Sequence, residues 1–170
     1  MNAAKTKFMA KERSAMNELI QAYAQGYDQL TEALNGVSEE LLHFKPAPDK
    51  WSIKEVIIHV SDAEMIAIYR MKKIIAENNP LLFKFDPDAW AGRLKYESLD
   101  LQHYLELFKL QRAGMTAVLK GLQPDDWERT GVHNIAGKQT LKDIVSMFVG
   151  HVSRHIQQIE RNKQAFQSRI

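Results

Sequence analysis

Cysteine is absent from the 170 residues of this chain. Its absence excludes disulfide bonds, thiolate metal ligands and a cysteine nucleophile together. Any metal ion that the protein holds must therefore be bound through nitrogen and oxygen atoms. Any thiol that takes part in its chemistry must come from another molecule.

Long apolar runs and blocks of like charge are also missing. No apolar segment approaches the length that is needed to cross a membrane. The first twenty residues carry charge throughout, unlike a signal peptide. Lys and Arg alternate with Asp and Glu, and the formal net charge is only +2, which argues against the basic footprint of a nucleic-acid-binding protein. We therefore expect a cytoplasmic protein with neither a nucleic-acid nor a membrane partner.

What the chain does contain is helical periodicity. A hydrophobic content of 45% over 170 residues predicts a single domain covering residues 1–170. Apolar residues recur at helical spacing in four segments, at about 11–34, 52–77, 98–119 and from 140 onward. Alternating, strand-like runs are not evident, so the fold class that we predict is all-α, a four-helix bundle with two long connections.

Two of the predicted helices have clear starting signals. Ser52 and Glu55 have the spacing of a capping box, and Thr140 and Asp143 have a similar pattern. Each half of the chain reads as a helix, a long loop and a capped helix, so the two halves echo one another.

Three histidines fall on the inward faces of the two capped helices. His151 and His155, in "HVSRH", stand one turn apart on one side of a helix, on or beside its apolar stripe. His59 lies at the edge of the buried face of the other helix. Three inward imidazoles are the number of protein ligands that a catalytic zinc or nickel site commonly has. The alternative is that each is a core histidine satisfied by a neighbour.

Candidate acids and bases are fewer. Val152 follows His151, so the glutamate of an HExxH zinc peptidase is missing, which argues against that class. Asp62, three residues after His59, is a weak candidate for orienting an imidazole or a bound water molecule, and the alternative is an exposed helix aspartate. Glu55 is assigned to capping.

Other polar and aromatic residues receive structural interpretations. Tyr23 and Tyr27 either point hydroxyl groups into a cavity or belong to the core. Trp51 is expected to seal an end of the bundle, whereas Trp90 is left open between sealing and lining an apolar pocket. The remaining histidines are interpreted as ordinary polar residues: His43, His103 and His133.

The order of these motifs resembles that of a known family. Tryptophan-serine at a helix start, a histidine seven positions later, "FDPDAWA", "DW" and a closing HxxxH together resemble the DinB/YfiT-like metal-binding four-helix bundles, over about residues 23–161. The resemblance implies that His59, His151 and His155 bind a divalent ion, nickel or zinc, and that the protein forms a homodimer. It also implies a metal-dependent hydrolase, or a thiol-dependent transferase or isomerase that uses bacillithiol, mycothiol or glutathione.

Two classes of function follow. The first is an enzyme, a metal-dependent hydrolase or a thiol-dependent S-transferase that acts on a small electrophilic substrate. The second is a non-catalytic, stress-related bundle that binds metal without turnover, and the lack of a convincing general base keeps this class open.

A second apolar row on one helix bears on the homodimer. A row this wide either packs beneath the loop at residues 80–96 or meets its equivalent in a second copy across a two-fold axis. We expect the second arrangement. The row consists of Ile57, Ile58, Met65, Ile68 and Ile75.

Overall fold

The computed structural model describes residues 3–169, with side chains from residue 11 onward, so the charged N-terminal segment lies partly outside the described residues. Its elements are α1 (Ala3–Ala24), α2 (Gly26–Glu32), α3 (Glu39–His43), α4 (Ile53–Ala76), β1 (Leu81–Leu82), α5 (Pro87–Arg93), the 3-10 helix η1 (Tyr96–Ser98), α6 (Leu101–Lys120), α7 (Pro124–Trp127), β2 (Thr130–His133), β3 (Gly137–Thr140) and α8 (Leu141–Gln167). None of the helices in this range is long and apolar enough to span a membrane.

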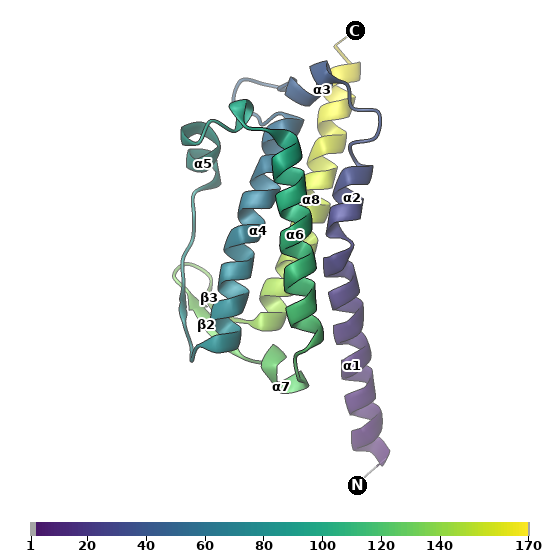
Figure 1. Cartoon of the computed structure of the whole chain (residues 1–170), viewed down its shortest axis with the longest axis vertical. Coiled ribbons are helices and arrows are strands. Elements are labelled where there is room, and N and C mark those ends of the chain that lie inside the picture. Colours follow the sequence, from purple (N-terminus) through teal and green to yellow (C-terminus); the bar gives the residue numbers. More distant parts are fainter. Residues whose placement is uncertain (1–2, 170) are drawn as a thin grey trace.

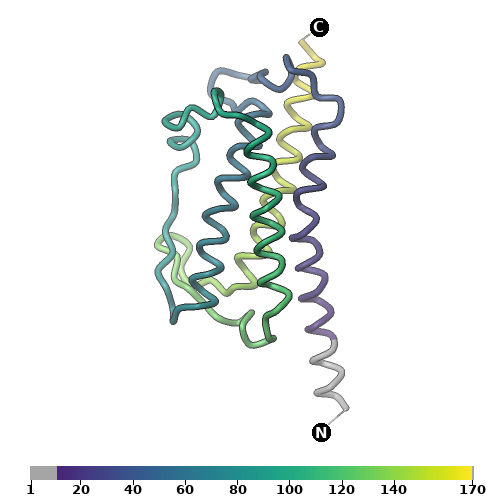
Figure 2. Tube along the Cα trace, viewed as in Figure 1, coloured from purple at the N-terminus to yellow at the C-terminus, as the bar shows by residue number. Residues whose placement is uncertain are grey.

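The bundle consists of four columns: α1 together with α2, and the single helices α4, α6 and α8. Figures 1 and 2 show these helices running side by side, and the predicted fold class is confirmed. Helix α4 packs against both α6 and α8, and α1 also packs against both of these helices. Helices α1 and α2 form one column, because the amide of Gln25 bonds the carbonyl of Gln21 and the amide of Gln29 bonds that of Gln25, each at 3.0 Å. The helix predicted at 11–34 is therefore this column.

The apolar stripes of the four columns meet in the core. Ile74 and Ile144 are fully buried in one half of the bundle, and Phe108 is fully buried in the other half. Trp127 of α7 is only 2% exposed and packs into the first of these clusters, which anchors the second long connection to the bundle end. Complete burial of one such side chain stabilises the fold by about 1.5–3 kcal/mol.

A small sheet joins the two long connections, and the sequence did not predict it. Strand β1 runs parallel to β2, with Leu81 opposite Val132, and β2 runs antiparallel to β3. Each strand has only two to four residues, too few to show an alternating pattern. Gly131 allows the close packing, because a Cβ there would lie 3.0 Å from Cδ1 of Leu82.

The apolar row that suggested a dimer is largely covered within the chain. Ile57 and Ile58 are fully buried, and Ile58 packs with Ala91 of α5 and Tyr96 of η1. Ile68 and Ile75 are partly buried against the core. Met65 is the most exposed of the five, at 45%. The row thus offers less apolar surface than the sequence suggested, and the homodimer stays a prediction.

Candidate metal centre

Two helix caps set the positions of the three histidines. The Ser52 hydroxyl accepts from the amide of Glu55, and the Glu55 carboxylate accepts from the amide of Ser52, at 3.2 and 2.8 Å. Thr140 and Asp143 make the same reciprocal pair at the start of α8. Both predicted caps are confirmed. They fix where α4 and α8 begin, and hence which side chains in the following turns face inward.

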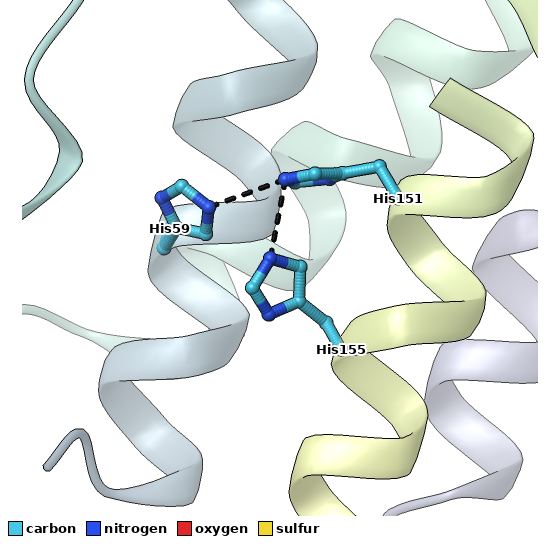
Figure 3. A group of neighbouring side chains, drawn as sticks. All are labelled: His59, His151 and His155. Carbon is cyan, nitrogen blue, oxygen red and sulfur yellow. Dashed lines mark hydrogen bonds between the residues drawn. The ribbon is translucent and has the colours of Figure 1, made fainter. Parts of the chain in front are cut away.

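The three histidines converge on one point between α4 and α8. Figure 3 shows His59 on α4 facing His151 and His155 on α8. The Nε2 atom of His151 lies 3.3 Å from that of His59 and 3.1 Å from that of His155. One ligand atom from each residue lies within 4.8 Å of the others, so the group could hold a divalent metal ion. We call these three residues the histidine cluster.

Burial keeps the imidazoles neutral. Desolvation lowers the pKa of His59 to about 3 and the pKa of His151 to about 2, and the nearby imidazole of His155 adds to both shifts. Burial also lowers the pKa of His155, although its hydrogen bond to Gln158 opposes this shift. At neutral pH all three rings therefore carry a lone pair, which is the form that binds metal ions.

The three rings are supported in different ways. Nδ1 of His155 lies 2.9 Å from Oε1 of Gln158, and since an amide oxygen can only accept, Nδ1 carries the proton and Nε2 keeps the lone pair. Nδ1 of His59 is buried without a partner. Aromatic packing holds that ring instead, with the Trp51 and Phe85 ring centroids at 4.7 and 6.2 Å. Sequence reasoning gave no role to Gln158, nor to Phe85, which is the first residue of the "FDPDAWA" motif.

Asp62 lies near the cluster in sequence, but its carboxylate has another partner. The Tyr96 hydroxyl donates to it at 2.5 Å, and burial raises the pKa of Asp62. Asp62 is 8% exposed, so the alternative of an exposed helix aspartate is wrong. The contact holds η1 against α4. A role for Asp62 in orienting a metal ligand stays a prediction, with no hydrogen bond to a histidine among the described contacts.

Next to the histidine cluster lies a buried ion pair that the sequence did not predict. Arg112 of α6 contacts the Glu64 carboxylate of α4 at 2.8 Å, and the Tyr23 hydroxyl of α1 donates to the same carboxylate. Arg112 also donates to the carbonyls of Tyr23 and Phe148 at 2.8 and 3.0 Å. Arg112 follows Phe108 by one turn, a signal that marks it as inward. We call Tyr23, Glu64 and Arg112 the ion-pair cluster.

The other histidines stay outside the centre. The side chains of His43 and His103 are 45% and 86% exposed. Nδ1 of His133 accepts from the amides of Ile135 and Ala136, both at 3.1 Å, and so closes the β2–β3 turn. These placements agree with their interpretation as ordinary polar residues.

Comparison with known proteins agrees with this architecture. A protein of Oceanobacillus iheyensis named "Putative metal-dependent hydrolase" is 29% identical over 109 residues, which make up 64% of this chain and 63% of that protein. A Bacillus licheniformis protein of the same name is 26% identical over 135 residues, 79% of this chain and 77% of that protein.

The fold has a solved counterpart, and a family model matches the chain. YfiT from Bacillus subtilis, described as a probable metal-dependent hydrolase with an unusual four-helix bundle topology, superposes with a TM-score of 0.83 at 22% identity, covering 89% of this chain and 87% of that chain. The model of the DinB superfamily matches residues 22–159, close to the span over which the sequence motifs showed the resemblance. Since this match covers most of its length, the chain belongs to the DinB superfamily.

Proposed function

We propose that this protein is a metal-dependent hydrolase that acts on a small electrophilic substrate. The observation that carries the proposal is the convergence of the Nε2 atoms of the three histidines on one point. The names of the relatives support the same class. The ion that we propose is zinc or nickel, because both accept imidazole ligands and this site offers nitrogen alone.

The residues around the proposed metal site have different roles. His59, His151 and His155 bind the ion as neutral rings, and Gln158 keeps His155 in the binding tautomer. A divalent ion held there polarises a carbonyl group or lowers the pKa of a bound water molecule or thiol. Trp51 packs on His59, which is only 4% exposed.

A second candidate is a thiol-dependent S-transferase. It is favoured because the carboxylates near the histidine cluster are already paired with other side chains. Asp62 accepts from Tyr96, and Glu64 is paired with Arg112. Neither is free to act as the general base that water activation often needs. A thiol bound as thiolate to the ion needs no such base. Because the chain has no cysteine, this thiol must arrive as a cosubstrate such as bacillithiol or glutathione.

Metal analysis tests the shared part of both candidates. Purified protein is expected to hold about one divalent ion per chain, and His151→Ala or His155→Ala should weaken binding on the order of 100-fold or more, since two imidazoles compensate poorly for the ion's lost water. His103→Ala is the matched control, because this side chain is 86% exposed. Stoichiometric metal in both cluster variants would overturn the assignment.

Thiol titration separates the candidates from each other. Protein loaded with cobalt should develop a thiolate charge-transfer band when bacillithiol or glutathione is added, if the S-transferase candidate is right. A spectrum that responds to neither thiol, together with metal-dependent cleavage of ester or amide substrates, favours the hydrolase. A bound ion with no exchangeable water and no response to thiols would instead indicate the non-catalytic alternative.

A further inference from the structure

Trp51 connects the histidine cluster to an open depression in the surface. Its ring centroid lies 4.7 Å from that of His59 and 6.5 Å from that of His155, and its plane is only 14° from the plane of the latter. The same side chain lines a depression of about 410 Å³. The other lining residues are Asp49, Lys50, Asp88 and Gln158. Two lining residues, Trp51 and Gln158, therefore touch imidazoles of the cluster.

The position of Trp51 is fixed from both sides. Its carbonyl accepts from Nδ2 of Asn162 at 2.9 Å, and Asn162 is 4% exposed. The next residue, Ser52, is held by the capping box with Glu55. The indole is half-buried, so part of it still faces solvent. A flat ring that is held in place and partly exposed can stack with a ligand at a low entropic cost.

We propose that Trp51 is the stacking platform of a substrate subsite, and that the substrate carries a flat apolar group, such as an aromatic ring, next to its metal-binding group. The inference rests on the proposed function, since the metal-binding group needs the ion. The depression is within the size range of small-molecule sites, and Trp51 is the aromatic residue among its lining residues. Trp51 thereby selects among electrophiles by the shape of the group beside the reacting atom.

A pair of hydroxamates tests the subsite without knowledge of the substrate. Acetohydroxamate and benzohydroxamate present the same metal-binding group with a methyl or a phenyl tail. Their affinities for zinc-loaded protein are measured by calorimetry, and the ratio of the two is compared between variants. Intrinsic differences between the two ligands cancel in this comparison, as in a double-mutant cycle.

Two variants of Trp51 distinguish the effect of a flat aromatic ring from the effect of apolar volume alone. Trp51→Leu should reduce the preference for benzohydroxamate by about three- to tenfold, whereas Trp51→Phe should keep most of it. Phe83→Leu is the control, the same kind of change at a side chain that is 59% exposed on the segment before α5. An equal preference in the wild type and in zinc-loaded Trp51→Leu would overturn the inference.

Further measurements decide the test when a variant or the wild-type protein does not bind as expected. If Trp51→Leu fails to hold zinc, tryptophan emission is measured instead: benzohydroxamate should quench it in the wild type and much less in Trp51→Phe, and equal quenching contradicts the platform. If zinc-treated wild type binds neither hydroxamate, the proposed metal site itself fails, and the inference falls with it. A normal metal content with an unchanged ligand preference overturns the subsite alone.

Discussion

Two polar clusters lie side by side in this bundle, and they differ in how their atoms are paired. In the ion-pair cluster, Arg112 provides donors to the Glu64 carboxylate and to two backbone carbonyls, and the Tyr23 hydroxyl donates to the same carboxylate. In the histidine cluster, three groups of one kind turn the same atom toward a common point. In the ion-pair cluster, donors and acceptors of opposite charge match one another, whereas the histidine cluster brings together three groups of the same kind.

This difference is why we propose the histidine cluster, and not the ion-pair cluster, as the functional site. Buried polar groups normally find partners, and the ion-pair cluster does so across three helices, which makes it a structural link. Neutral imidazoles gain little from one another, since each pair of facing ring nitrogens can share at most one proton. They gain much from a cation placed between them. The following experiments test this contrast, in order of decreasing effect.

The ion-pair cluster should respond most strongly to removal of one partner. Arg112→Met leaves Glu64 buried without its cation, and we expect the free energy of unfolding to fall by about 3–5 kcal/mol in urea titrations. Adding Glu64→Gln keeps an acceptor for Tyr23 and removes the lone charge, so the double variant should recover a large part of the loss. A cost of Arg112→Met below about 1 kcal/mol would contradict the assigned role.

The histidine cluster should instead respond through metal affinity. Gln158→Ala frees the tautomer of His155 and should weaken zinc binding by about 10- to 100-fold. Gln158→Glu should restore it, because a carboxylate also accepts from Nδ1. The neighbouring exposed residue supplies the control Gln157→Ala. Unchanged affinity in Gln158→Ala would show that packing alone orients the ring.

Acid should destabilise the metal-free protein through the same histidines. Their pKa values are lowered in the folded state, so below about pH 6.5 the unfolded chain takes up protons that the folded chain does not, and stability falls as the pH falls. Each such histidine contributes a slope of about 1.4 kcal/mol per pH unit. His151→Gln should flatten the curve measured between pH 7 and pH 5, and the difference in slope should approach that value toward pH 5. Parallel curves for variant and wild type would refute the prediction.

The smallest effect is expected at Asp62, which tests whether this residue belongs to either cluster. Tyr96→Phe removes the hydroxyl that donates to Asp62 and should cost about 1 kcal/mol of stability. Zinc affinity should stay the same, because the contact holds η1 and not a histidine. A fall in affinity as large as that of Gln158→Ala would place Asp62 in the metal centre.

Local signals explain why much of the fold was predictable from the sequence. Ser52 and Thr140 are the N-caps that mark where α4 and α8 begin. Helical periodicity then predicts which later residues face the core and which face solvent. This is why His59 and His151 could be placed together although their helices are far apart in the chain. The assignment of the cluster as metal ligands remains a prediction that the metal analysis described above tests.

Contacts between distant segments explain what was not predicted. The sheet arises where two connections about fifty residues apart meet, and its two-residue strand β1 carries no pattern of its own. The partner of Asp62 lies 34 positions away, on a 3-10 helix of three residues. Arg112 and Glu64 were not singled out in the sequence, and the packing of α4 against α6 is what shows that they pair.

The two helices that carry the histidine cluster are far apart in the chain, so an ion bound between them would also constrain how the chain unfolds. His59 and His151 are 92 positions apart, so an ion that holds both is a reversible cross-link that closes more than half of the chain into a loop. The unfolded chain cannot keep this link intact without losing much of its freedom. Free metal at 1,000 times the dissociation constant would raise the stability by about 4 kcal/mol, so that the melting temperature of the protein reports the metal supply around it.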